Sequence, residues 1–566
     1  MEPIILDTAL KIGIVSGVSA SGVFVKLNHA GLKSGSYHLG GRYGRGEVGE
    51  IILIEGQTSL TIGKIIDVKL PEKERSSLNT PIQQDEKVDA IGYVQLLGSV
   101  NLSSLRVTAG VSIYPRIGDV LFSAPSGFLS LLPRLTDNIS SEEPSQAKLI
   151  DIGCVSENNH DNVSVSPGKL FGRHCAILGS TGGGKSWTTA RLIQECSKFN
   201  NSKVILIDAT SEYRSLPENY TIHMHLGTPI EKHKSSLPFR IPPTDFDESD
   251  FLMLFEPSGK VQGPKLRAAM RSLRLAHLAP DAASNGVILK TGCSKKQYRE
   301  AMKRNNNSHL VDNPSQPFDV RKLVPQIIQE CHFDNGGDSW GNESTTEISY
   351  CSSLFTRILC ITNSPSFLTV FEENDNPSLT KVLEDFLNSK SKVLRLCLSG
   401  LSHEFHAKEI LANVLGRKLM LLSRQGAFLK RPLLTVIDEA HNFLGKKVGN
   451  EDSSIRLDAF EIIAKEGRKY GLNICLATQR PRDITEGVIS QMGTLIVHRL
   501  TNNNDREIIE RACGEADRAM VSFLPNLKQG EVAIIGVDFP IPLTVQVNKP
   551  LHPPLSDSPD YQTLWG

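Results

Sequence analysis

A glycine-rich segment near residue 180 has the residue types and the spacing that bind phosphate. Gly179-Ser-Thr-Gly-Gly-Gly184-Lys185-Ser186 matches the pattern G-x-x-x-x-G-K-[ST] at every specified position. The backbone N–H groups of such a loop turn inward around an anion, and the helix that follows adds the partial positive charge of its N-terminus. We expect Lys185 to reach the β- and γ-phosphates of a nucleotide and Ser186 to ligate Mg²⁺.

The residues on either side of this segment favour a phosphate loop over the alternative, a chance glycine-rich turn. An apolar run, Cys175–Gly179, precedes it, and Trp187, Ala190 and Ile193 follow at the three-residue spacing of a helix. A strand, a loop and a helix in this order are the context that the motif requires. The predicted nucleotide-binding residues of this segment are Gly179, Ser180, Thr181, Gly182, Gly183, Gly184, Lys185, Ser186 and Trp187.

A pair of carboxylates ends another apolar run, Leu433-Leu-Thr-Val-Ile-Asp438-Glu439. We expect Asp438 to hold the hydration shell of Mg²⁺ and Glu439 to polarise the attacking water, so that ATP is hydrolysed with Mg²⁺ as cofactor. One alternative is a carboxylate pair that caps the following helix. Another is the Asp-Glu-Ala-His motif of a different helicase superfamily, which residues 438–441 also match. The later Gln-Arg-x-Gly-Arg motif of that superfamily is missing from this sequence.

The composition is that of a globular protein. Of 566 residues, 39% are hydrophobic and 22% are charged, which argues against wholesale disorder or a fibrous chain. Lys plus Arg and Asp plus Glu both number 62, so any contact with nucleic acid must be local. With no run of 18 apolar residues and no secretory leader, we expect a soluble, cytoplasmic protein that does not contact membrane. Ten scattered cysteines without a Cys-x-x-Cys pair predict free thiols.

Residues 1–150 are predicted to form a small β-barrel, either Greek-key or partly open. Short segments rich in β-branched residues alternate there with glycine-containing turns. Between them, residues 71–87 are predicted to form a long exposed loop, and residues 136–148 a linker out of the barrel. The predicted strands are 12–15, 23–27, 48–54 and 62–68.

Residues 151–240 and 391–550 are predicted to form an α/β core. Their apolar runs lack strict alternation, as is typical of parallel strands covered by helices on both faces. Between them, residues 241–390 show amphipathic helical patterns and are predicted to be a helical insertion, and residues 551–566 form a proline-rich tail. The predicted core strands are 175–179, 204–208, 393–398, 433–438, 473–478 and 494–498.

Further motifs resemble the HerA family of ATPases over nearly the whole chain, with residues 280–390 departing from it. The resemblance implies a RecA-like P-loop ATPase core with an N-terminal HerA-type barrel and a helical insertion. It also implies a homo-hexameric ring with ATP between subunits and double-stranded DNA in the central pore. The motifs are Arg173-His174, Asp208 with Glu212-Tyr213, Glu466-Gly-Arg468-Lys-Tyr-Gly471, Thr478-Gln479-Arg480-Pro481, Ser490-Gln491, Arg499-Leu-Thr-Asn502 with Asp505, Leu524-Pro525 and Gly530-Glu531.

The same resemblance implies roles for polar residues around the nucleotide. Arg468 is the first candidate for a finger that completes the site of a neighbouring subunit, and Arg173 is the second. One of the two can instead act within its own subunit, and the alternative for either is a surface ion pair. Gln479 is placed like residues that sense the γ-phosphate. Asp208 and Glu212 either support the metal or the water, or cap the next turn.

Partners are also implied by the resemblance. The segment from Gly445 to Arg456 would lie near the pore and contact DNA, unless it is simply a solvated loop. The barrel is similar to platforms that dock a separate effector protein. That effector is either a nuclease or a sirtuin-like NADase in bacterial anti-phage defence, or a NurA-type nuclease in DNA-end resection. The divergent insertion and the ordinary Asn and Cys content favour defence. A different class of function is an ATP-dependent scaffold that activates an effector without productive translocation.

Overall fold

The computed structural model describes residues 6–27, 36–38, 41–43, 46–70, 90–102, 106–111, 113–136, 148–156, 161–228, 235–334, 336–371, 375–401, 404–445, 447–448, 455–513, 520–555, 563 and 565. The predicted loop at 71–87, most of the predicted linker at 136–148 and most of the side chains between 445 and 456 lie outside these residues. The chain divides into two compact units, Met1–Ser202 with Asn473–Ser556, and Lys203–Leu472 with Asp557–Gly566.

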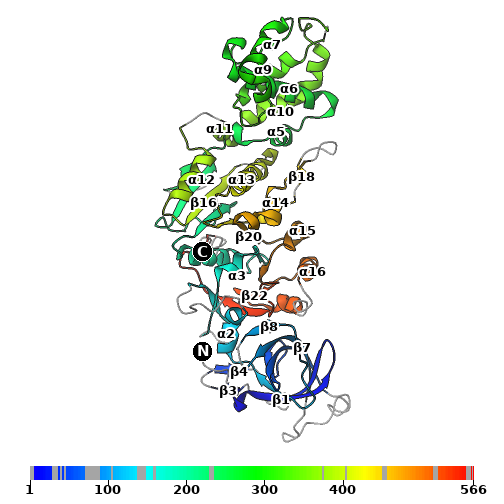
Figure 1. Ribbon diagram of the computed structural model, residues 1–566, viewed down its shortest axis with the longest axis vertical. Coiled ribbons are helices and arrows are strands. Elements are labelled where there is room, and N and C mark those ends of the chain that lie inside the picture. Colours follow the sequence, from blue (N-terminus) through cyan, green and yellow to red (C-terminus); the bar gives the residue numbers. More distant parts are fainter. Residues whose placement is uncertain are drawn as a thin grey trace. The chain divides into compact units, whose positions relative to one another are not determined.

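The first unit begins with an antiparallel β-barrel (Figure 1). Its strand order is β2-β1-β9-β5-β6-β7-β8, and a further pairing between β2 and β7 closes the ring. The predicted small barrel is therefore present, and it is closed. The strands are β1 Lys11–Val18, β2 Gly22–Leu27, β5 Ile51–Glu55, β6 Ser59–Lys69, β7 Ala90–Asn101, β8 Val107–Ala109 and β9 Val120–Ser123; β3 Ser36–His38 pairs with β4 Gly41–Tyr43, and α2 spans Ser126–Leu135.

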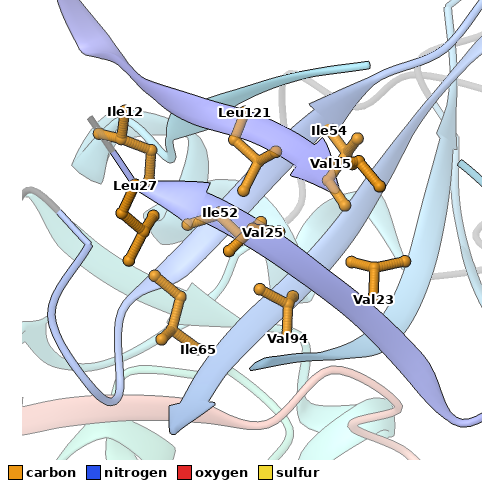
Figure 2. Packing of buried hydrophobic residues seen from close by; sticks show 10 residues of the cluster. All are labelled: Ile12, Val15, Val23, Val25, Leu27, Ile52, Ile54, Ile65, Val94 and Leu121. Carbon is orange, nitrogen blue, oxygen red and sulfur yellow. The ribbon is translucent and has the colours of Figure 1, made fainter. Parts of the chain in front are cut away.

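Branched aliphatic side chains fill the barrel, as Figure 2 shows. In β2 the burial alternates, so that Val23, Val25 and Leu27 point inward while Phe24 and Lys26 face outward. Gly13 allows β1 to approach β2 closely, because a Cβ there would lie 2.2 Å from the carbonyl oxygen of Lys26. The core side chains are Ile12, Val15, Val23, Val25, Leu27, Ile52, Ile54, Ile65, Val94 and Leu121.

The rest of the first unit is built on strands in the order β11-β10-β23-β22-β21-β12-β20. β12 lies between β20 and β21 and is parallel to both, whereas the pairings from β21 out to β11 are antiparallel. The elements are β10 Ile150–Val155, β11 Asn162–Val165, α3 Pro167–Phe171, β12 Cys175–Leu178, α4 Lys185–Ser197, β20 Leu472–Thr478, α15 Glu486–Ile489, β21 Thr494–Val497, α16 Asn503–Ala512, β22 Glu531–Ile535 and β23 Leu543–Val547.

The second unit contains parallel strands in the order β17-β13-β16-β14-β15. Every residue of β13 is buried, as expected for a parallel strand with both faces covered. The elements are β13 Lys203–Asp208, β14 Thr221–Gly227, β15 Leu237–Pro238, β16 Val393–Gly400, α13 Ala407–Arg424, β17 Leu433–Ile437, β18 Lys447–Val448, β19 Ile455–Arg456 and α14 Ala459–Glu466.

Helices occupy the second unit between β15 and β16, and the described residues there form no strand. Helices α6, α7, α9 and α10 gather into one bundle (Figure 1). The small core at one end of this bundle packs Leu275, Ile288, Ala301 and Val311 together. The helices are α5 Glu248–Phe255, α6 Gly259–Leu278, α7 Lys295–Lys303, α8 Asn307–Leu310, α9 Leu323–Glu330, α10 Thr345–Thr362, α11 Pro365–Phe371 and α12 Leu379–Asn388.

The fold class agrees with the prediction of an α/β chain with a small β-barrel at its N-terminal side and a helical segment between two core strands. All ten cysteines are free thiols, as expected. Within the described part of the chain, each helix is either too short or too polar to cross a lipid bilayer.

Candidate nucleotide-binding site

The predicted phosphate loop joins the buried strand β12 to helix α4 in the first unit. Gly184 is the N-cap of α4 with a φ of 106°, and Gly182 has a φ of 76°. Both angles lie in the left-handed region, which glycine adopts without the steric cost that a Cβ brings. The loop therefore bends back on itself, and the N–H groups of the first turn of α4 are left to meet an anion.

Backbone hydrogen bonds hold this loop from two sides. The His498 N–H donates to the Leu178 carbonyl at 2.7 Å, and the Ser180 N–H donates to the Arg499 carbonyl at 3.1 Å, so the end of β21 runs beside the start of the loop. From the other side, the Gly530 N–H donates to the Gly183 carbonyl at 3.1 Å. The loop is thus fixed by segments that lie more than 300 residues further along the chain.

A cavity of about 400 Å³ opens onto the loop. Arg499 and Thr501, which are exposed and directly follow β21, form part of its wall. Lys185 is only 4% exposed and lies at the first position of α4. The sequence motif Arg499-Leu-Thr-Asn502 does not by itself predict that these residues line the cavity. The lining residues are Ser180, Thr181, Gly182, Gly183, Arg499, Thr501 and Gln529.

The structure brings Gln479 to the phosphate loop. The hydroxyl of Thr181 donates a hydrogen bond to Oε1 of Gln479, which directly follows β20. Trp187 lies one position beyond Ser186 in α4 and is half-buried, with the ammonium of Lys549 6.0 Å from the centre of its ring. Gln479 thus sits beside the loop, where an incoming nucleotide would meet it.

Arg173 has a partner within its own unit. Its Nε atom lies 3.5 Å from Oδ1 of Asp538, and the Arg173 side chain is 48% exposed. The Gly493 N–H donates to the Arg173 carbonyl at 2.7 Å. These contacts correspond to the ion-pair alternative for this residue, and they leave part of the guanidinium accessible.

The acidic pair belongs to the second unit, directly after β17. Asp438 is fully buried, and its N–H donates to the Ile207 carbonyl of β13 at 3.1 Å. Glu439 is in the left-handed conformation with a φ of 48°, which is uncommon for a residue other than glycine. One Glu439 carboxylate oxygen lies 3.2 Å from Nδ1 of His441. Such backbone strain concentrates at functional sites, because surrounding contacts must hold it in place.

Asp208, at the end of β13, caps the turn that follows it. Its carboxylate accepts hydrogen bonds from the N–H groups of residues 210–213 at 2.8–3.3 Å. Nε of Arg395, in β16, lies 2.7 Å from Oδ2 of Asp208, and both side chains are at most 1% exposed. These contacts correspond to the capping alternative. For Glu212, one carboxylate oxygen is buried and has no hydrogen-bond partner among the described residues.

Arg468 lies on the short turn Gly467–Tyr470 and is exposed. No side-chain hydrogen bond or ion pair of Arg468 is found in the described part of the chain, whereas the nearby Glu466 pairs with Arg424 at 2.9 Å. Its guanidinium is therefore available to a group outside this chain.

A larger cavity, of about 620 Å³, lies in the helical insertion. Lys265 and Lys295 line it, but each is paired with a carboxylate, Glu347 at 2.7 Å and Asp334 at 3.3 Å respectively. None of the predicted site residues lines this cavity. Among the described residues, no group of three or more His, Cys, Asp or Glu side chains could hold a metal ion.

Comparison with known proteins relates the central region of the chain to one family. The family described as the central domain of helicase HerA matches residues 150–415. The probable DNA double-strand break repair helicase HerA of Methanocaldococcus jannaschii is 26% identical over 416 residues, which cover 71% of this chain and 76% of that protein. The DNA double-strand break repair helicase HerA of Saccharolobus solfataricus is 26% identical over 396 residues, with coverages of 70% and 68%.

Among solved structures, the bacterial conjugative coupling protein TrwB covers 76% of this chain and 94% of its own, at 14% identity and a TM-score of 0.45. The central region of this chain thus matches the family described as the central domain of helicase HerA, and about 70% of the chain is similar to the two HerA helicases.

Proposed function

We propose that this protein is a Mg²⁺-dependent ATPase motor of the HerA type, which forms a hexameric ring and translocates on or unwinds double-stranded DNA. The observation that carries the proposal is the phosphate loop itself, with Gly182 and Gly184 in left-handed conformations at the start of α4 and a cavity in front of it. The two HerA relatives are named as DNA double-strand break repair helicases, which supports DNA as the partner.

In this proposal the phosphates of ATP lie against the loop, with Lys185 at the β- and γ-phosphates. The hydroxyl of Ser186 and the carboxylate of Asp438 would hold Mg²⁺, which prefers such hard oxygen ligands. When bound, the metal neutralises charge that builds up on the transferring phosphoryl group. Glu439 orients and polarises the attacking water, and the contact with His441 holds its carboxylate in place.

The arginines support the proposed ring. A phosphoryl group in transfer needs a cation beside it. Arg468 is exposed and makes no side-chain hydrogen bond or ion pair with the described residues, so it can supply this cation to a neighbouring subunit. Arg173 is proposed to act within its own subunit, because Asp538 already restrains it there. Gln479, beside Thr181, is proposed to sense the γ-phosphate.

The biological setting we propose is bacterial anti-phage defence, with a nuclease or NADase effector docked on the barrel. DNA-end resection with a NurA-type nuclease is the second setting. The ATP-dependent scaffold remains the alternative of a different class. DNA dependence separates motor from scaffold, because a motor couples ATP turnover to the duplex whereas a scaffold does not need it.

The test is ATP turnover by the purified protein with and without duplex DNA, in wild type and in Lys185→Ala. Lys198→Ala is the matched control, since Lys198 is an exposed lysine that directly follows α4 and pairs with Glu195. We expect wild type and the control to hydrolyse ATP faster on DNA, and Lys185→Ala to be inactive. Turnover in Lys185→Ala equal to wild type would refute the site, and turnover indifferent to DNA would favour the scaffold.

A mixing experiment tests the ring. Arg468→Ala protein and Lys185→Ala protein are each expected to be inactive alone. If Arg468 acts on the neighbouring subunit, mixed rings contain some sites with both an intact loop and an intact arginine, so part of the turnover returns. No recovery after verified subunit exchange would contradict the action of Arg468 across the interface.

A further inference from the structure

His498 lies directly under the phosphate loop, at the end of β21. Its side chain is fully buried. Its backbone N–H donates a hydrogen bond to the carbonyl of Leu178, which is the last residue of β12. The parallel pairing of β12 with β21 brings Leu178 opposite Val497, so the next residue of β21 arrives beside the first residue of the loop. This position has no role in the mechanism above.

The glycines of the loop pack against this histidine. A Cβ on Gly179 would lie 2.6 Å from Cβ of His498, and a Cβ on Gly184 would lie 3.3 Å from its Cε1. At Gly183 the corresponding distance to Cβ of His498 is 3.4 Å. The His498 side chain, from Cβ to the imidazole ring, therefore occupies the space that side chains at these three positions would need, and the glycine backbone packs against it.

The ring is also bonded to helix α4. Nε2 of His498 lies 2.9 Å from Oγ1 of Thr188, which is fully buried in the first turn of the helix. Burial lowers the pKa of His498 to about 4, the positive charge of Lys185 lowers it as well, and the carbonyl of Gly183 opposes them. The imidazole is therefore neutral at physiological pH and adds no charge of its own to a site that already contains Lys185.

We propose that His498 is a positioning residue for the phosphate loop: its ring supports Gly179, Gly183 and Gly184 and its hydrogen bond to Thr188 fixes the first turn of α4, which sets the N–H groups for phosphate. The inference rests on the proposed nucleotide site. Because its side chain is fully buried, His498 acts through the loop and lowers the cost of ordering the loop when phosphate binds.

The test measures the dissociation constant of a fluorescent ADP analogue, together with the melting temperature, in single and double variants. Thr188→Val and His498→Leu each remove the hydrogen bond but keep apolar volume, and we expect each to weaken binding about tenfold, as loss of one buried hydrogen bond implies. His498→Gln places an amide near the position of Nε2 and should recover most of the affinity. The double variant should be no weaker than the weaker-binding single variant, because both remove one interaction.

Thr189→Val is the matched control. Thr189 is the next residue of α4, is equally buried, and its hydroxyl bonds the Lys185 carbonyl at 3.0 Å within the helix. We expect it to lower the melting temperature as much as Thr188→Val does, but to leave the affinity within about twofold.

Equal affinity losses in Thr188→Val and Thr189→Val, or losses that add in the double variant, would overturn the inference. Because the readout is binding, it stands apart from the hydrolysis test. If the wild-type protein binds nucleotide but does not hydrolyse it, the proposed ATPase activity is refuted. The role of His498 is then decided by the nucleotide affinities of the variants. Wild type that binds no nucleotide refutes both.

Discussion

Replacing Gly179 with alanine should damage the phosphate loop, and the size of the effect can be worked from the distances. The added Cβ would lie 2.6 Å from Cβ of His498 and 3.3 Å from its Cγ. Ordinary contact between carbon atoms begins near 3.5 Å, so the two backbones must separate by about 1 Å. His498 cannot retreat alone, because its N–H is bonded to Leu178 and its side chain is fully buried.

Overpacking of this kind costs roughly 1–3 kcal/mol. For a unit of this size that corresponds to a melting temperature lower by about 2–10 °C. The loop must take up much of the shift, and a displacement of about 1 Å breaks at least one charge-assisted hydrogen bond to phosphate. Losing one such bond weakens nucleotide binding by roughly 10- to 100-fold.

The assay is nucleotide titration combined with thermal unfolding, with Gly127→Ala as control. Gly127 is in α2 of the same unit, and a Cβ there meets no atom within 4 Å, so this variant should bind and melt like wild type. If Gly179→Ala retains wild-type affinity and melting temperature, then the close contact with His498 does not constrain the loop and the reasoning fails.

Three further predictions concern other groups. Glu439→Gln should bind ATP with wild-type affinity but lose nearly all turnover in a single-turnover assay, and normal turnover would show that the water-activating role is misassigned. Arg395→Met leaves the buried Asp208 carboxylate without its cation and should lower the free energy of unfolding in urea by about 3–5 kcal/mol; a loss below about 1 kcal/mol would contradict this. Because burial lowers the pKa of His498 from its ordinary value of 6.5 to about 4 in the folded protein, the unfolded chain takes up a proton first as pH falls through 6.5. Protonation of His498 in the unfolded chain should therefore lower the free energy of unfolding by about 2 kcal/mol between pH 8 and pH 5. If the free energy of unfolding of His498→Gln falls as much as that of wild type over this pH range, this contribution is ruled out.

Much of the fold could be predicted because its signals are local. Apolar runs such as 204–208 and 473–478 are buried strands within a residue of the expected bounds, since a parallel strand covered on both faces must be apolar throughout. Strand β14, Thr221–Gly227, is absent from the predicted set. Its two histidines interrupt the apolar run, although His223 is buried through a hydrogen bond to the Leu216 carbonyl at 2.9 Å.

The candidate site was predictable only where one short segment carries the chemistry. The phosphate loop needs glycines and a lysine at fixed spacing, so the sequence displays it directly. Arg499 and His498 come to the loop because β21 lies next to β12, and strand order is not encoded in local periodicity. Similarly, the sequence does not decide whether Asp208 supports the metal or caps a turn, because its partner Arg395 lies 187 residues further along the chain.

The proposed hydrolysis requires the phosphate loop and the acidic pair to act on the same nucleotide. The most direct measurement is an experimental structure of the protein with Mg²⁺ and a non-hydrolysable ATP analogue. We predict the γ-phosphate at Lys185, the metal at Ser186 and Asp438, and Glu439 beside the position of the attacking water. A nucleotide bound away from residues 179–186, or a metal remote from Asp438, would contradict the account.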